Sequence, residues 1–130
     1  MAESIFTKII KGEIPCYKIA EDDRFIAFLD VFPIKIGHTL VVPKAQIDYL
    51  FDLDDRLLSD FMLFTKKVAQ KMKKAISCER IGVAVIGLEV PHAHIHLVPL
   101  DSVGDIDFGQ PKLQLSSNEM AEIADSIRIN

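Results

Sequence analysis

The sequence has few of the features that mark secreted, membrane-bound or redox-active proteins. It contains two cysteines, Cys16 and Cys78, which lie too far apart to form a Cys-x-x-Cys zinc or redox motif. No segment approaches the roughly 20 apolar residues of a membrane-spanning helix, and the N-terminus lacks a basic and apolar leader. We therefore expect a reduced, cytoplasmic protein with no membrane partner.

Positive charge is also scarce. The 15 basic residues are outnumbered by 19 acidic ones, and the formal net charge of -4 offers no basic field to a polyanionic polymer. A long nucleic acid is thus excluded as a partner. The basic cluster falls on a predicted helix, where we interpret it as a solvated outer face. Its members are Lys66, Lys67, Lys71, Lys73 and Lys74.

The apolar content supports one compact domain. Of the 130 residues, 49% are hydrophobic, which is enough for a core without disulfide bonds, and no repeat or linker interrupts the chain. Residues 101–112 are rich in aspartate and glycine and read as a loop. We therefore expect a domain over residues 1–100, with residues 101–130 forming a loop and a helix packed on the same domain.

The hydrophobic patterns predict an α+β fold with an antiparallel sheet of about five strands. Strands are expected at residues 17–20, 24–29, 39–42, 80–86 and 92–100. Helices are expected at residues 5–10, from Asp52 or Asp54 to about residue 76, and after a capping box formed by Ser116 and Glu119. The last of these is a short helical tail.

Three of the four histidines alternate along one predicted strand. His92, His94 and His96 lie at i, i+2 and i+4, so a strand would place their imidazoles on one face about 6 to 7 Å apart. Neutral imidazoles act as nucleophiles, acids, bases or hydrogen-bond donors, which favours phosphoryl chemistry without a metal. Two alternatives stay open: satisfied core histidines, and a zinc site made by a His-x-His pair with His38.

The segment from His92 to Val98 matches the His-φ-His-φ-His-φ-φ signature of the histidine triad (HIT) superfamily, and the chain resembles its Hint-type branch. The resemblance extends over about residues 5–99. It includes FTKIIKGEIP at residues 6–15, EDD at 21–23, AFLD at 27–30, Pro33, GHTLVVPK at 37–44 and DL at 52–53. It implies a HIT-like fold and a nucleotide-binding hydrolase with a nucleotidyl-histidine intermediate and no cofactor.

The resemblance also assigns catalytic roles. His94 is the expected nucleophile at the α-phosphorus, and the main-chain carbonyl of His92 is expected to fix its tautomer. His96 donates to the phosphate, and His38 completes the hydrogen-bond network from the neighbouring strand. Because transferase relatives carry Gln at the third histidine, His96 favours hydrolysis.

Further positions match the nucleotide-binding residues of the family. Asp30 is expected to bind the ribose hydroxyls, and Ile9, Phe28 and Val31 would line an apolar base pocket that favours purines. For these three residues, core packing is an equally good explanation. The family commonly forms two-fold dimers through the long helix and a strand, so we expect a homodimer.

The loop before the triad departs from the family pattern. Residues 85–91 read VIGLEVP and lack the Asn and the Gly-Gln-Ser or Gly-Gln-Thr step that contacts phosphate in Hint-type proteins. Glu89 replaces a hydroxyl residue, and its carboxylate would repel a phosphate unless protonated or paired with a cation. Glu89 therefore either favours an amine-bearing leaving group or faces solvent.

A structural zinc found in some bacterial relatives is not expected. Its cysteine and histidine ligands correspond to Ser4, Thr7 and Gln46 in this chain. The sequence thus favours a hydrolase of nucleoside phosphoramidates, nucleotidyl adducts or dinucleoside polyphosphates. The alternatives are a non-catalytic nucleotide sensor and a metal-dependent hydrolase that uses the histidines as ligands.

Overall fold

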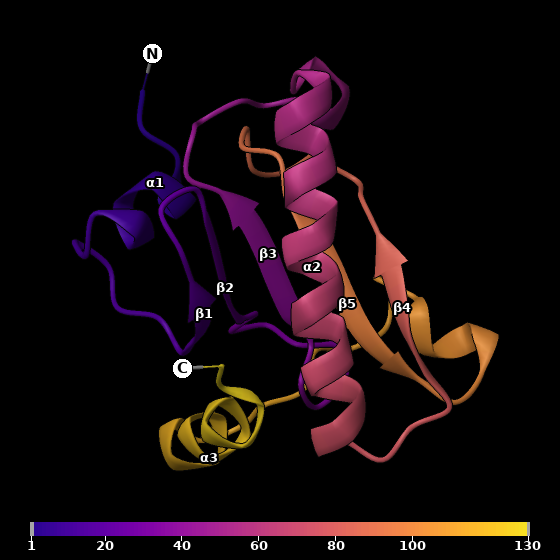
Figure 1. Cartoon of the computed structure of the whole chain (residues 1–130). Coiled ribbons are helices and arrows are strands. Elements are labelled where there is room, and N and C mark those ends of the chain that lie inside the picture. Colours follow the sequence, from indigo (N-terminus) through magenta and orange to yellow (C-terminus); the bar gives the residue numbers. More distant parts are fainter. Residues whose placement is uncertain (1, 130) are drawn as a thin grey trace.

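The computed structural model describes residues 2–129, and it has the predicted α+β architecture (Figure 1). The elements follow one another as α1 (Ile5–Ile10), β1 (Lys18–Glu21), β2 (Phe25–Leu29), β3 (Thr39–Pro43), α2 (Asp55–Ala75), β4 (Arg80–Ala84), β5 (Ile95–Leu100) and α3 (Ser117–Ile127). Two short 3-10 turns, Leu50–Asp52 and Val103–Ile106, precede α2 and follow β5. Within residues 2–129, none of the helices has the length and apolarity needed to cross a membrane.

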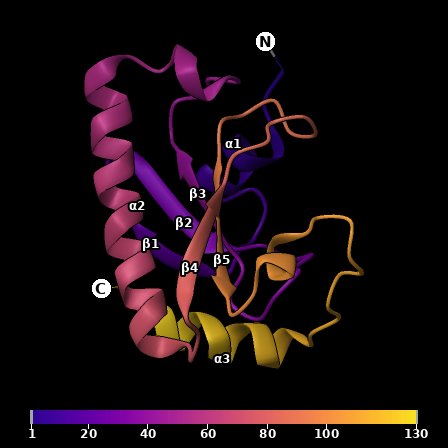
Figure 2. The ribbon, with the colours of Figure 1, turned by 90° about the vertical axis from the view of Figure 1, so that its right-hand side faces the viewer.

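The five strands form one antiparallel sheet in the order β1-β2-β3-β5-β4. Helix α2 covers one face, while α1 and the segment between β5 and α3 lie on the other (Figure 2). Strand alternation separates the two faces, because Ala27 and Val41 join the core beneath α2 and Phe28 and Leu40 join a second cluster with Phe6. On β5, Ile95 and Leu97 point to the α2 core, so His96 points to the opposite face.

Helix α2 begins at Asp55 and is capped by Asp54, one of the two predicted caps; the Asp54 carboxylate accepts a hydrogen bond from the Leu57 amide at 2.8 Å. Its buried stripe lies against the sheet as the periodicity predicted. The stripe consists of Phe61, Phe64, Thr65, Val68 and Met72. Four of the five clustered lysines are exposed, and Lys71 is half-buried. This placement agrees with a solvated outer face.

Strand β5 begins at Ile95, so the prediction of a strand from residue 92 was wrong at its start. Pairing with β3 ends at Val41 opposite Ile95. Beyond that pair, Pro43 has no amide hydrogen to donate, and its carbonyl bonds instead to the His92 ring. Strand β4 likewise ends at Ala84 and not at residue 86, because its pairing stops opposite His96.

The C-terminal helix α3 has the predicted capping box, in which Ser116 and Glu119 bond reciprocally to each other's backbone amides. Its apolar face belongs to the main core, since Met120, Ala124 and Ile127 are buried together with residues of α2 and the sheet. The last helix therefore contributes directly to the packing under the sheet.

Candidate active site

A cavity of about 550 Å³ lies on the face of the sheet opposite α2. Its walls come from α1, the end of β2, the start of β3, the β4–β5 loop, the histidine segment and the chain after β5. Nearly all of the side chains expected to bind a nucleotide line it. They are Ile9, Phe28, Asp30, Val31, His38, Glu89, His94 and His96.

The sheet explains how residues distant in sequence meet at this cavity. Asp30 follows β2 and His38 precedes β3, and the Asp30 amide donates to the His38 carbonyl at 2.9 Å. Strand β3 pairs with β5 so that Leu40 lies opposite His96. Gly37 makes the turn into β3 with a φ of 88°, which a side chain would strain. Hydrogen bonding across β2, β3 and β5 thus brings Asp30, His38 and His96 together.

The hydrogen bonds of His94 leave one ring nitrogen available. Its Nδ1 lies 2.7 Å from the main-chain carbonyl of His92, the contact expected from the family resemblance. A carbonyl can only accept, so Nδ1 carries the hydrogen and Nε2 of the neutral ring keeps its lone pair. The ring packs edge-on against Phe6 and His96, with centroid distances of 5.0 Å to each. His94 is therefore held as an oriented nucleophile or base.

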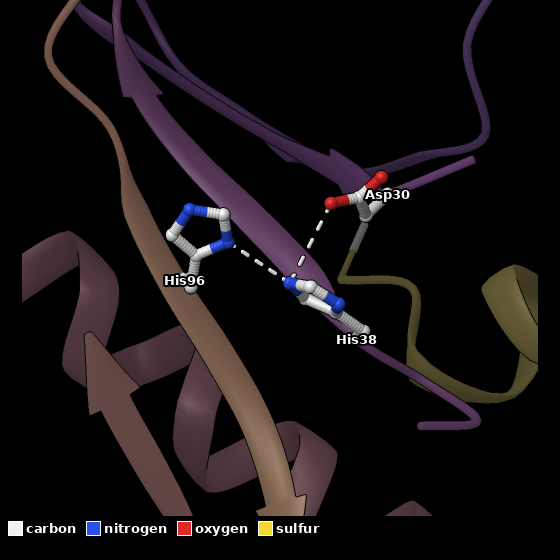
Figure 3. A group of neighbouring side chains, drawn as sticks. All are labelled: Asp30, His38 and His96. Atoms are coloured by element: carbon white, nitrogen blue, oxygen red, sulfur yellow. Dashed lines mark hydrogen bonds and ion pairs between the residues drawn. The ribbon is translucent and has the colours of Figure 1, made fainter. Parts of the chain in front are cut away.

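His38, His96 and Asp30 form a second group (Figure 3). The Ile34 amide donates to Nδ1 of His38 at 3.2 Å, so the hydrogen of a neutral His38 is on Nε2. That Nε2 lies 2.9 Å from Nδ1 of His96 and 3.6 Å from the Asp30 carboxylate. With its Nδ1 accepting from His38, His96 carries its hydrogen on Nε2. This chain of hydrogen bonds from Ile34 through His38 leaves the Nε2–H of His96 available as a donor. Binding of a phosphate oxygen requires such a donor.

The same three side chains could also hold a cation. Their ligand atoms, one from each of Asp30, His38 and His96, lie within 4.8 Å of one another. This set differs from the zinc site considered from the sequence, because Asp30 takes part and the His-x-His pair does not. Imidazole and carboxylate are ordinary zinc ligands, so this group defines the metal alternative.

His92 behaves differently from the other two triad members. Its ring is fully buried, with Nε2 2.7 Å from the Pro43 carbonyl and Nδ1 2.7 Å from the Ser4 hydroxyl. The expectation that His92, His94 and His96 share one pocket is therefore corrected: His38, which lies just before β3, takes the third place beside His94 and His96. The side chain of His92 supports the segment, and its carbonyl orients His94.

The three residues in place of zinc ligands form a hydrogen-bond network around His92. The Ser4 amide and the Thr7 hydroxyl both donate to the Gln46 side-chain oxygen, at 2.8 and 2.6 Å. The Ser4 hydroxyl meanwhile bonds to His92, as described above. This network ties α1 to the triad segment, a supporting function that the sequence analysis did not identify.

Burial favours the neutral forms of His38, His92 and His96 by lowering their pKa values. The His38 pKa falls from 6.5 to about 4, chiefly through desolvation and secondarily through the positive charge of Lys112. Desolvation also lowers the pKa of His96 to about 4, helped by the neighbouring His94 and His38 and opposed by Asp30. The pKa of His92 is lowered as well, again mainly by burial. The hydrogen bonds from Ile34 to His38 and from His38 to His96 require neutral rings, because each ring accepts at Nδ1.

These shifts predict an acid-sensitive fold. The folded pKa values of about 4 for His38 and His96 lie below the unfolded value of roughly 6.5, so the unfolded chain binds more protons between these limits. Stability is thus fully present above about pH 6.5 and is lost as pH falls, by up to about 1.4 kcal/mol per pH unit for each ring. Urea unfolding across this window would measure the loss; a free energy of unfolding independent of pH there would contradict it.

Three cavity residues were not identified from the sequence. Phe6 contacts the rings of both His92 and His94, and Phe108 contacts His38 and His96. Lys112 lines the cavity from the segment between β5 and α3. Phe6 belongs to residues 6–15, which resemble the family, so the sequence could have indicated it as a cavity residue. Phe108 and Lys112 lie in a stretch read only as a loop, where no local pattern points back to the histidines.

Comparisons with known proteins identify the family of this chain. The family model of the HIT domain matches residues 11–103. Two proteins named adenosine 5′-monophosphoramidase are each 34% identical to this chain: that of Schizosaccharomyces pombe, over 95% of this chain and 94% of its own, and that of Saccharomyces cerevisiae, over 94% and 78%. The crystal structure of a HIT-like protein from Bartonella henselae superposes with a TM-score of 0.83 at 32% identity, covering 97% of this chain and 95% of that one. The chain therefore belongs to the HIT domain family.

Proposed function

We propose that the protein is a nucleotide hydrolase that cleaves at the α-phosphate through a nucleotidyl intermediate on His94. The observation that carries this proposal is the 2.7 Å contact between Nδ1 of His94 and the His92 carbonyl, which leaves Nε2 as a nucleophile at a nucleotide-sized cavity. The names of the two yeast relatives support the same chemistry. The substrate is a nucleoside phosphoramidate, a nucleotidyl adduct or a dinucleoside polyphosphate.

In the proposed binding mode the base occupies the apolar part of the cavity, between Ile9, Phe28 and Val31. Phe28 is 2% exposed and packs on Phe6, whereas Val31 is 56% exposed and leaves an open edge for a purine ring. The Asp30 carboxylate lies at the border between this apolar part and the histidines. It accepts from the ribose hydroxyls, and the phosphate then lies over His94 and His96.

The reaction proceeds in two displacements. Nε2 of His94 forms a bond to the α-phosphorus while the bond to the leaving group breaks, and the leaving group takes that electron pair and a proton from solvent water. Water then adds to phosphorus and loses a proton as the phosphorus–Nε2 bond breaks, which releases the nucleoside monophosphate. The Nε2–H of His96 donates to a phosphate oxygen in both steps and stabilises the added charge.

Glu89 gives this proposal a preference among leaving groups. Its side chain is exposed and belongs to the cavity wall in the β4–β5 loop. An ionised carboxylate there repels a second phosphate and attracts an amine. We therefore place phosphoramidates and aminoacyl adducts ahead of dinucleoside polyphosphates.

The proposal is tested by incubating the purified protein with adenosine and guanosine phosphoramidates and dinucleotides. We expect repeated turnover of at least one phosphoramidate to the nucleoside monophosphate and amine, with the same rate after treatment with a chelator. Tight AMP binding without turnover of any compound would instead support the nucleotide sensor.

A metal-dependent hydrolase is the second candidate, favoured by the clustering of Asp30, His38 and His96 within 4.8 Å. It predicts stoichiometric bound metal and loss of turnover with the chelator. The same assay therefore separates the two mechanisms, because nucleophilic catalysis by His94 needs no cation.

We also propose a two-fold homodimer through α2 and β4. Strand β4 is an edge of the sheet, and an edge strand needs a partner or cover. Strand β4 also contacts helix α2. The exposed apolar residues Leu63 on α2 and Val83 on β4, 58% and 54% exposed, supply the hydrophobic surface.

A further inference from the structure

The chain between β5 and α3 is anchored across the histidine side of the cavity. Near its start, the Asp105 carboxylate accepts from the Asp101 and Ser102 amides at 2.8 and 2.9 Å and pairs with Lys35 at 3.1 Å. Near its end, the Leu113 amide donates to the Pro33 carbonyl at 2.8 Å. The segment between these two anchors is therefore held in place, and Phe108 and Lys112 within it line the cavity. Figure 2 shows this segment on the side of the sheet away from α2.

Phe108, in the middle of this segment, packs on the catalytic histidines. Its ring lies edge-on to His96 and His38, with centroid distances of 4.7 and 5.9 Å. Such contacts exclude water from the imidazole pair and contribute to the desolvation that keeps both rings neutral. The segment is thus part of the site and not a remote tail.

Lys112 lies four residues after Phe108 and also lines the cavity. Its ammonium donates to the Phe108 carbonyl at 2.7 Å and lies 5.9 Å from the Phe108 ring centroid. These contacts hold the end of a long side chain near the histidines while leaving two of its three N–H donors free.

A phosphate bound in the cavity requires a positive charge, and Lys112 supplies it. Among the described residues that line it, Lys112 is the one with a fixed positive charge, whereas Asp30 and Glu89 are acidic. The neutral His38 and His96 supply donors but no charge. Residues 85–91 of the β4–β5 loop, VIGLEVP, also have no side-chain amide or hydroxyl that could donate to a phosphate. A phosphate in this cavity would otherwise face two carboxylates without a compensating cation.

We propose that Lys112 binds the α-phosphate of the substrate within its own chain, and that Phe108 positions it beside the catalytic histidines. This inference rests on the proposed function, since it assigns the phosphate contact of that same site. The same ammonium also stabilises the negative charge that builds up on the phosphate oxygens in each displacement.

The test compares AMP with adenosine, which lacks the phosphate, in titration calorimetry at low ionic strength. We expect Lys112→Met to weaken AMP binding about tenfold or more and to leave adenosine binding unchanged, because a charged hydrogen bond to phosphate is lost. Lys112→Arg should retain most of the affinity. Lys74→Met, on an exposed lysine of α2, changes the net charge equally and should have no effect.

Each outcome bears on the inference. Unchanged AMP affinity in Lys112→Met, or an equal loss for AMP and adenosine, would overturn it while leaving the proposed function intact. Wild-type protein that binds neither ligand would overturn both. As a second readout, the ring signals of His38 and His96 in NMR titrations should show raised pKa values in Lys112→Met, since its charge lowers both. If Lys112 had only a structural role, Lys112→Met would not weaken the binding of AMP more than that of adenosine.

Discussion

Replacing His94 by Asn is expected to lower kcat by at least about a thousandfold, because the reaction loses its nucleophile. The Asn amide can still donate to the His92 carbonyl, which accepts from Nδ1 of His94 at 2.7 Å in the wild type. The local backbone should therefore keep its conformation. The effect is measured as the rate at which the nucleoside monophosphate is released from a nucleoside phosphoramidate.

The control for this variant is nucleotide binding. AMP affinity should stay within a few-fold of the wild type, because Asp30, His96 and the apolar part of the cavity are intact. Quenching in alkaline denaturant during turnover, which preserves a phosphorus–imidazole bond, should trap a labelled nucleotide on the wild-type protein and not on the variant. Retention of a tenth or more of the wild-type rate would rule out His94 as the nucleophile.

The largest effect on stability is expected from Phe61→Ala, at about 3 to 5 kcal/mol in the free energy of unfolding. Phe61 is fully buried on α2, and its ring stacks on Phe25 of β2 with a centroid distance of 5.4 Å and an interplanar angle of 14°. Truncation leaves a cavity between the long helix and the sheet that carries the site. Urea or thermal unfolding at neutral pH measures the loss.

Phe51→Ala provides a matched comparison, because Phe51 is 69% exposed in the turn before α2. It should cost less than about 1 kcal/mol. The folded fraction of Phe61→Ala should keep wild-type nucleotide affinity, since Phe61 faces the sheet from the side opposite the cavity. Equal losses for the two variants would show that the α2 core is not the main source of stability.

Much of the architecture followed from local patterns. The cap at Asp54, the apolar stripe of α2 and the capping box before α3 depend on contacts within a few residues, so the sequence predicted them. The alternation of His94 and His96 with apolar neighbours likewise indicated a shared face. Strand ends were less well predicted, because the start of β5 depends on where β3 can supply a hydrogen-bonding partner.

The sequence by itself determined that a compact α+β domain carries a histidine row typical of phosphoryl chemistry, since spacing fixes which side chains share a face. Only the tertiary structure decided that the ring of His92 is enclosed by Ser4 and Pro43 while His38 takes its place at the cavity. It also brought Phe108 and Lys112 to the same histidines. Such contacts depend on strand order and join chain segments that are far apart in sequence, so short-range sequence patterns carry no information about them.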